Sequence, residues 1–254
     1  MLNNEKELKE ILSVLNKEGI LTNTILIGSW CLLFYKYVFE HFEPTVRTTD
    51  IDFFVPNPKA IKEKNGLINS LKEINYDLVR DTLTNKSTFI SPDGFELEFL
   101  TKLNRSNLVC VKLGNTNVYA ESISYLDIFV GNYIEVNFES INLKVASPSS
   151  YVLQKLLINE QRKAKSEKDM ESIKNVLLYI GASRKFKNEL KNLFDSLPRK
   201  WQKEILKTAK RNNIDLIGFW AICCNVLLHF AKNPTIIIKS ITLDISLISS
   251  KLKI

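Results

Sequence analysis

The sequence predicts an α+β fold, in which a small mixed β-sheet with flanking helices is followed by an all-helical region. Two observations carry this expectation. Up to residue 146, short apolar runs alternate with turn-forming residues, a pattern typical of strands. After Ser147-Pro148, apolar residues recur with the helical period of about 3.6. We therefore expect two domains, residues 1–146 and 147–254, with the helical domain closing a cleft over the sheet.

The first predicted element is a helix over residues 5–18, which Gly19 is expected to end. Its apolar residues recur at helical spacing: Leu8, Ile11, Leu12 and Leu15. The pattern then predicts, in order, a strand at 24–27, a helix at 30–39, a strand at 48–55 and an amphipathic helix at 59–75.

Short strands follow, separated by turn signals such as Pro92-Asp93-Gly94 and Gly114-Asn115. These strands are predicted at 76–81, 88–90, 95–101, 117–120, 135–137 and 141–145. The helical region is predicted to contain segments at 149–163, 166–180, 183–195, 199–211, 214–230 and 236–250.

Composition is that of an ordinary globular protein: of 254 residues, 45% are hydrophobic and 25% are charged. No apolar run reaches the roughly 18 residues that a membrane-spanning helix needs, and the charged N-terminal stretch lacks a signal-peptide pattern. The four cysteines show no metal-binding spacing. These features predict a cytoplasmic protein with reduced thiols and no membrane partner.

The formal charge of +7 is unevenly distributed along the chain. Residues 144–211 contain 17 Lys and Arg against 7 Asp and Glu, a net charge of +10, whereas the remainder carries −3. A basic half beside a slightly acidic one favours contact with phosphate, either of a nucleotide or of nucleic acid. The alternative is that the lysine-rich helices are simply solvated.

Two closely spaced carboxylates, Asp50 and Asp52, are the residues that most clearly indicate a chemical site. Asp50 and Asp52 lie two residues apart in a predicted strand, so that both side chains point to one face while Ile51 and Phe53 point to the other. Two ionised carboxylates side by side repel each other, and a fold that keeps them usually places a cation between them. We therefore expect a Mg²⁺ site, with Mn²⁺ as the alternative metal.

Two further segments fit this site. Gly28-Ser29 ends a predicted strand, where a residue without Cβ lets backbone N–H groups approach a phosphate and where the Ser29 hydroxyl can donate to it. A third carboxylate, needed for a two-metal transfer, is available at Glu96 or Glu98 in the strand at 95–101. We favour Glu98, which lies deeper in the apolar run, and keep Glu96 as the alternative.

These segments together resemble the nucleotidyltransferase superfamily related to DNA polymerase beta. The matching motifs are Ile27-Gly28-Ser29, Asp50-Ile51-Asp52 and Leu97-Glu98-Phe99. The stretch from Arg47 to Phe53 is similar to a bacterial branch that includes the AbiEii-type toxins. A later segment with Lys155 and Lys168-Asp169 is similar to the helices that follow the catalytic sheet in that branch.

The resemblance implies an enzyme that moves a nucleoside monophosphate from a nucleoside triphosphate to an acceptor hydroxyl, with release of pyrophosphate. Asp50, Asp52 and Glu98 would be catalytic and would hold the metal. The predicted nucleotide-binding residues are Gly28, Ser29, Arg47, Lys155 and Lys168. Trp30 departs from the smaller residue usual after Gly-Ser, and either narrows the base pocket or packs in the core.

Alternatives stay open at this point. The acceptor could be RNA such as tRNA, a protein side chain or a small molecule, and a toxin–antitoxin role depends on neighbouring genes. Arg47 could bind a phosphate or an acceptor, or pair with one of the acids. The chain could also be a nucleotide-binding or antitoxin-like module without turnover, or an unrelated α+β protein in which Asp50 and Asp52 face solvent.

Overall fold

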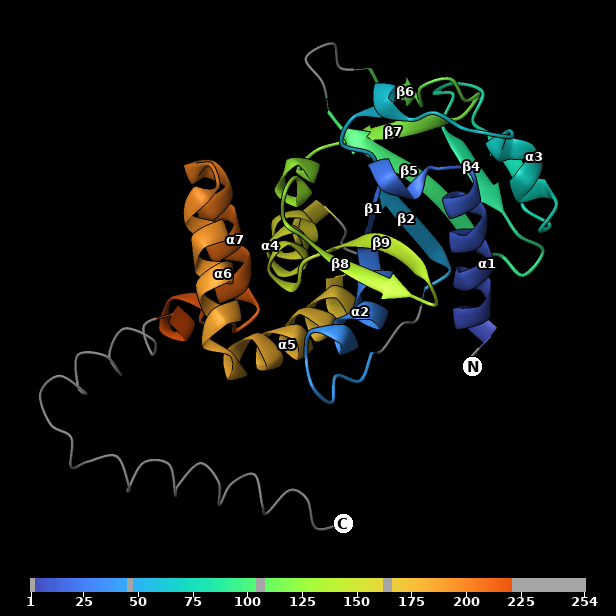
Figure 1. The fold of residues 1–254 in the computed structure, drawn as a ribbon. Helices are drawn as coiled ribbons and strands as arrows, with labels where there is room; N and C mark the ends of the chain where they lie inside the picture. Colours follow the sequence, from blue (N-terminus) through green and yellow to red (C-terminus); the bar gives the residue numbers. More distant parts are fainter. Residues whose placement is uncertain (1–2, 45–47, 104–107, 162–165, 221–254) are drawn as a thin grey trace, which may run out of the picture. The chain divides into compact units, whose positions relative to one another are not determined.

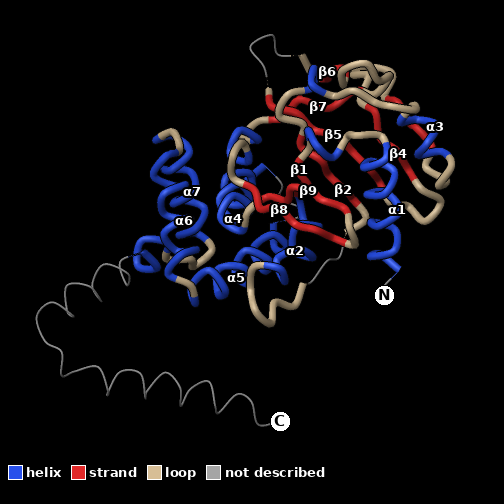
Figure 2. The backbone as a smooth tube through the Cα atoms, viewed as in Figure 1, coloured by secondary structure: helices blue, strands red, loops and turns tan. Residues whose placement is uncertain are grey.

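The computed structural model describes residues 3–44, 48–103, 108–161 and 166–220. In these residues nine strands form one mixed sheet, with helices to either side of it (Figures 1 and 2). The strands are β1 (Ile25–Ile27), β2 (Asp50–Phe54), β3 (Asp77–Arg80), β4 (Ser87–Ile90), β5 (Glu96–Lys102), β6 (Cys110–Lys112), β7 (Tyr119–Ile123), β8 (Tyr133–Phe138) and β9 (Ile141–Ala146). The α+β fold class is confirmed.

The α-helices are α1 (Asn3–Lys17), α2 (Cys31–Phe34), α3 (Leu67–Lys72), α4 (Pro148–Ile158), α5 (Ser166–Ala182), α6 (Arg184–Ser196) and α7 (Arg199–Arg211). Short 3-10 turns flank them: η1 (Leu21–Asn23), η2 (Gly28–Trp30), η3 (Tyr35–Tyr37), η4 (Pro58–Ala60), η5 (Leu126–Phe129) and η6 (Asn159–Gln161). In the described part of the chain, no helix combines the length and the apolar character that crossing a membrane requires.

The strand order is β3-β4-β5-β2-β1-β9-β8. The central strand β2 runs parallel to β5 and antiparallel to β1. One edge of β5 is shared: its first half pairs with β4, and its last residues pair with β7. The Gly28 end of β1, the Asp50 end of β2 and the Glu96 end of β5 therefore lie at the same edge of the sheet.

The two faces of this sheet differ in burial. Side chains that alternate onto one face form the core, where Ile51, Phe53, Leu97, Phe99 and Phe89 are at most 1% exposed. On this side α1 and α3 pack against each other (Figure 1), and α1 buries its apolar stripe completely. On the other face, the first residues of β2 and β5 carry acidic side chains that are only half-buried, whereas Phe54 and Leu100 further along the same strands are buried. Alternation therefore separates core from site on the same strands.

After the sheet, α4 begins where the sequence predicts a helix. Pro148 takes the first helical position, and the Ser147 side chain caps the helix by accepting a hydrogen bond from the Ser150 N–H at 3.2 Å. Helices α5, α6 and α7 match the predicted segments closely. The predicted segment 214–230 is described only up to residue 220, where residues 216–220 are helical, and the segment 236–250 lies outside the described residues.

The chain divides into two compact units, residues 1–208 and 209–254. The sheet, α4, α5 and α6 all belong to the first unit. The expected boundary at Ser147-Pro148 thus lies inside that unit, and the division into a catalytic and a helical domain stays a prediction.

Two predicted helices are shorter in the structure. The expected helix 30–39 consists of α2 between the 3-10 turns η2 and η3. The expected helix 59–75 is reduced to α3, because Gly66 has φ +105° and the backbone N–H groups of Lys64 and Asn65 donate to Glu18 instead of to helical carbonyls. Strand β6 is an element that the sequence pattern did not predict.

Candidate active site

Asp50 and Asp52 extend from β2 on its half-buried face, as the alternation predicts. Between and after them, Ile51 and Phe53 are fully buried on the opposite face. This contrast fixes the direction of both carboxylates, because any slip by one residue would put two charges into the core.

The register of β2 against β5 adds two more carboxylates to the same face. Asp50 pairs with Glu96 and Asp52 pairs with Glu98, in a parallel ladder whose strands lie about 4.8 Å apart. Both glutamates are half-buried, and the apolar residues between them point into the core. Four carboxylates therefore extend side by side from two neighbouring strands.

Gly28 lies directly against this group. Its φ of +73° is in the left-handed region, and a Cβ at this position would lie 2.7 Å from Asp52 Oδ2. The backbone turn after β1 can approach the carboxylate only because residue 28 has no side chain. Ser29 follows in the same turn and is half-buried.

Trp30 packs in the core. Its side chain is 1% exposed and its ring lies 6.3 Å from that of Phe95, between centroids. Of the two alternatives for this residue, the contacts in the structure are those of core packing.

Glu98 has strong partners on the sheet face. Lys86 Nζ lies 2.8 Å from its carboxylate, and the Thr88 hydroxyl donates to the same oxygen at 3.0 Å. Lys86 also pairs with Glu121 at 3.0 Å. Lys86 could not be predicted from the sequence, because it meets these acids only through the order of β4, β5 and β7.

Glu96 has a different environment. Within the described parts of the chain, its carboxylate makes no hydrogen bond or ion pair, although its backbone N–H donates to Thr49 at 3.0 Å. The two glutamates that the sequence left as alternatives thus differ clearly in their contacts.

A divalent metal fits this donor set chemically. Carboxylate oxygens are the ligands that Mg²⁺ prefers, and the paired register brings side chains from two strands together. With the side chains as they stand, no three His, Cys, Asp or Glu groups among the described residues converge closely enough to hold an ion. Rotation of the side chains on a fixed backbone would be needed to bring their oxygens together.

Lys155 lies on α4 and is buried, with 2% of its surface exposed. Its ammonium pairs with Asp169 Oδ1 of α5 at 2.8 Å and lies 5.8 Å from the centre of the Tyr151 ring. Lys168 precedes Asp169 on α5 and is half-buried. In this arrangement Lys155 and Asp169 join two helices, and the phosphate contacts expected of Lys155 and Lys168 stay predictions.

Cys31 on α2 is a fully buried thiol that donates to the Leu26 carbonyl. Burial raises its pKa well above the usual range, the Lys155 charge lowers it, and the Asp52 charge raises it. A thiol with a raised pKa stays protonated and unreactive. Arg47, the remaining predicted nucleotide-binding residue, lies outside the described residues.

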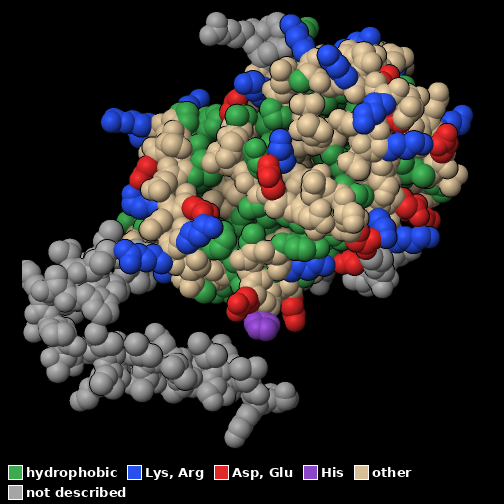
Figure 3. Space-filling view, in the orientation of Figure 1, with side chains coloured by type: hydrophobic (Ala, Val, Ile, Leu, Met, Phe, Trp, Pro, Cys, Tyr) green, Lys and Arg blue, Asp and Glu red, His purple; other side chains and the backbone are tan. Residues whose placement is uncertain are grey.

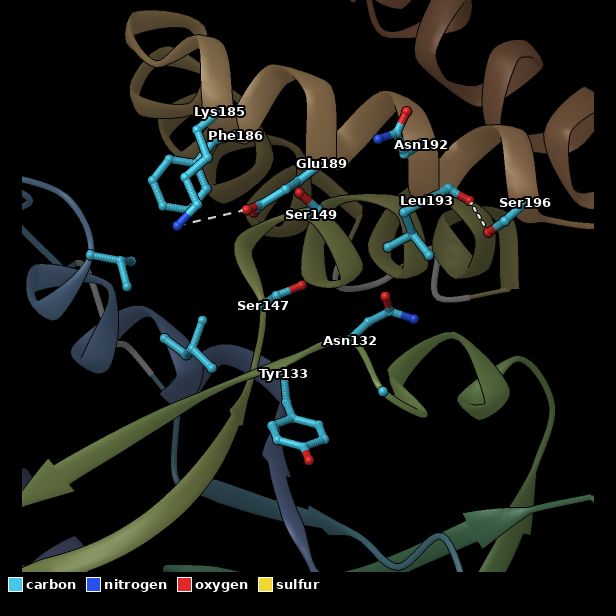
Figure 4. A pocket seen from close by; sticks show the side chains of 13 residues that line it. Asn132, Tyr133, Ser147, Ser149, Lys185, Phe186, Glu189, Asn192, Leu193 and Ser196 are labelled. Atoms are coloured by element: carbon cyan, nitrogen blue, oxygen red, sulfur yellow. Dashed lines mark hydrogen bonds and ion pairs between the residues drawn. The ribbon is translucent and has the colours of Figure 1, made fainter.

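A separate cavity of about 580 Å³ lies between α6 and the beginnings of β8 and α4 (Figure 4). Ser149 of α4 and Tyr133 of β8 line it, and the Lys185–Glu189 pair of α6 lies at its margin, with its charged atoms 3.9 Å apart. None of the site residues described above lines this cavity.

Comparison with known proteins identifies the family. A family model described as nucleotidyltransferase matches residues 6–196, about three quarters of the chain. The chain belongs to this nucleotidyltransferase family. The match spans the Gly28 turn and all four carboxylates, and it confirms the expected superfamily and an enzyme of the nucleotidyltransferase type. The AbiEii-type branch is not confirmed.

Two solved structures are distantly similar. One is ANT(2")-Ia in complex with adenylyl-2"-tobramycin, at 11% identity and a TM-score of 0.43, covering 81% of this chain and 97% of that one. The other is an antigenic nucleotidyltransferase-like protein from Paracoccidioides brasiliensis, at 17% identity and a TM-score of 0.38, covering 73% of this chain and 84% of that one. The search among curated proteins gives no match.

Proposed function

We propose that the protein transfers a nucleoside monophosphate from a nucleoside triphosphate to an acceptor hydroxyl at the acidic face of β2 and β5, with release of pyrophosphate. One observation carries the proposal. The one-for-one pairing of Asp50 with Glu96 and of Asp52 with Glu98 gathers carboxylates on a half-exposed face, directly beside the Gly28 turn.

Asp50 and Asp52 would hold Mg²⁺, or Mn²⁺ in its place, together with one glutamate of β5. The bound metal would neutralise phosphate charge and help to deprotonate the acceptor hydroxyl. Gly28 and Ser29 would bind the terminal phosphates through backbone N–H groups and a hydroxyl. Catalysis then consists mainly of positioning and charge neutralisation.

The strand order indicates from which side of β2 the acceptor would approach. The Gly28 turn follows β1 on one side of β2, whereas β5 lies on the other side. In an in-line transfer the acceptor hydroxyl attacks opposite the leaving pyrophosphate. If the terminal phosphates bind at Gly28, the acceptor enters over β5, and the third carboxylate lies on the acceptor side of the metal.

RNA is our first candidate for the acceptor. On α7, Arg199, Lys200, Lys203 and Lys207 are all exposed and recur along one side of the helix. Lys and Arg side chains are also visible on the side of the molecule where α6 and α7 lie (Figure 3). A row of cations favours a phosphate backbone. An acceptor such as tRNA would agree with the predicted AbiEii-type branch, which stays a prediction.

The test is incubation with each α-³²P-labelled nucleoside triphosphate, Mg²⁺ or Mn²⁺, total RNA and cell lysate. We expect the wild type to transfer label and Asp50→Ala to transfer none while it stays folded. The labelled band identifies the acceptor as RNA, protein or small molecule. Equal labelling by Asp50→Ala would contradict the proposal. Metal-dependent nucleotide binding without any transfer would instead indicate the binding or antitoxin-like module.

A further inference from the structure

Lys86 occupies an unusual place on the acidic face. Its ammonium bridges two carboxylates, Glu98 of β5 at 2.8 Å and Glu121 of β7 at 3.0 Å. The Lys86 side chain is only 28% exposed and that of Glu98 only 16%, so water screens this bridge less than it would a surface ion pair.

The sheet topology explains how one lysine reaches both acids. Along one edge of β5, β4 pairs with the first residues and β7 with the last, so that Thr88 is opposite Glu98 and Glu121 is opposite Leu100. Lys86 immediately precedes β4 and therefore lies at the junction of β4 and β7. Its position follows from the backbone arrangement of three strands rather than from a flexible surface contact.

The bridge holds Glu98 by one of its two carboxylate oxygens. Lys86 Nζ lies 2.8 Å from Glu98 Oε1. The Thr88 hydroxyl donates to the same oxygen at 3.0 Å, which is the second contact of Glu98. Both contacts come from the β4 side of β5, whereas Asp52 lies on β2 at the other side, so drawing the Glu98 carboxylate toward a metal at Asp52 would pull it away from Lys86 and Thr88.

Glu96 has no such restraint. It is one strand away from Asp50, at the edge of the sheet where the Gly28 turn also lies, and within the described residues its carboxylate has no partner to give up. The difference between the two glutamates is therefore set by Lys86 rather than by their own positions, which are equivalent in the ladder.

We propose that Lys86 is a positioning residue that binds Glu98 and Glu121, keeps Glu98 out of the metal site and leaves Glu96 to complete it with Asp50 and Asp52. Glu98 then stays bound to Lys86, on the side of the sheet face where the acceptor would enter. This inference rests on the proposed nucleotidyl transfer, and it departs from the sequence-based preference for Glu98 as the third acid.

The test is Mn²⁺ binding followed by electron paramagnetic resonance, with Mn²⁺ alone and with non-hydrolysable analogues of the four nucleoside triphosphates. We expect Glu96→Gln to weaken Mn²⁺ binding about 100-fold, the upper end of what changes around metal ligands cost. Glu98→Gln should bind Mn²⁺ as the wild type does. Thermal unfolding of each variant checks that the fold is intact.

The decisive variant combines Glu96→Gln with Lys86→Met. Removal of the ammonium frees the Glu98 carboxylate, and we expect the double variant to recover part of the Mn²⁺ binding that Glu96→Gln loses. Glu96→Gln with Lys86→Arg is the matched control, because arginine retains the bridge, and it should recover none. Recovery of Mn²⁺ binding in both double variants, or in neither of them, would overturn the inference.

A loss of Mn²⁺ binding in Glu98→Gln but not in Glu96→Gln would also overturn it and return the third acid to Glu98. Either result leaves the proposed function intact, provided that the wild type binds Mn²⁺ and transfers label. A wild type that does neither would instead contradict the proposed function itself.

Discussion

Gly28→Ala is the substitution whose effect can be worked out most completely from the structure. Two separate costs meet at this residue. The backbone has φ +73°, which an L-residue with a Cβ adopts at a cost of about 1–2 kcal/mol. The added methyl group would also lie 2.7 Å from Asp52 Oδ2, whereas ordinary contact begins near 3.4 Å, so the carboxylate has to move by about 0.7 Å.

The two costs affect different measurements. Backbone strain lowers the free energy of unfolding, and about 2–4 °C of melting temperature is lost per kcal/mol in a protein of this size. Displacement of Asp52 lowers the rate of transfer, because a misplacement of about 1 Å at a reacting centre costs about 100-fold. For the smaller shift here we expect a loss of about 10- to 100-fold in kcat/KM.

Gly131→Ala provides the matched control. Gly131 has φ +75°, almost equal to that of Gly28, but a Cβ there would meet nothing within 4 Å. Both variants should lose similar stability in thermal unfolding, and only Gly28→Ala should lose label transfer. If Gly28→Ala transfers label as fast as Gly131→Ala, the Gly28 turn does not position Asp52 for catalysis and the reasoning is wrong.

Three further predictions follow from other contacts. Burial raises the pKa of Glu18, but hydrogen bonds from Asn65, Ser70 and Lys64 lower it to a value below the ordinary 4.5. The stability that wild type has over Glu18→Gln should therefore be complete at neutral pH and disappear as the pH falls below about 4.5, in urea unfolding at each pH. Lys155→Met should lower the free energy of unfolding by about 3–5 kcal/mol, because it removes the buried ammonium that pairs with Asp169. Lys155→Met with Asp169→Leu should recover most of this loss in the same assay, and equal losses would contradict the buried pair. If RNA is the acceptor, changing Lys200 and Lys203 of α7 to Gln should reduce the slope of log K against log[salt] by about 2, and an unchanged slope would exclude this face.

Much of the site could be predicted because strand alternation needs only local sequence. The apolar residues on either side of Asp50 and Asp52 fixed the face of both acids, and the same rule placed Glu96 and Glu98 together on their own strand. Gly28 was expected from the sequence because a residue without Cβ lets backbone N–H groups approach a phosphate. Its positive φ and its closeness to Asp52 are further reasons for glycine that only the structure gives.

Other features depend on contacts between distant residues, which periodicity does not report. The helix expected over 59–75 is interrupted because Glu18, more than 40 residues away, accepts the N–H groups that a helix would use. Strand β6 has three residues, none of them buried, and so lacks an apolar pattern. Glu98 differs from Glu96 in its contact with Lys86, whose proximity is created by the order of three strands.

The most direct test of the account is a crystal structure with Mn²⁺ and a non-hydrolysable nucleoside triphosphate analogue, in which anomalous scattering locates the metal. The account predicts a Mn²⁺ peak between Asp50, Asp52 and Glu96, terminal phosphates at the Gly28 turn, and Glu98 still paired with Lys86. Bound Mn²⁺ away from Asp50 and Asp52 would contradict the site itself, whereas Mn²⁺ held there by Glu98 would contradict only the role of Lys86.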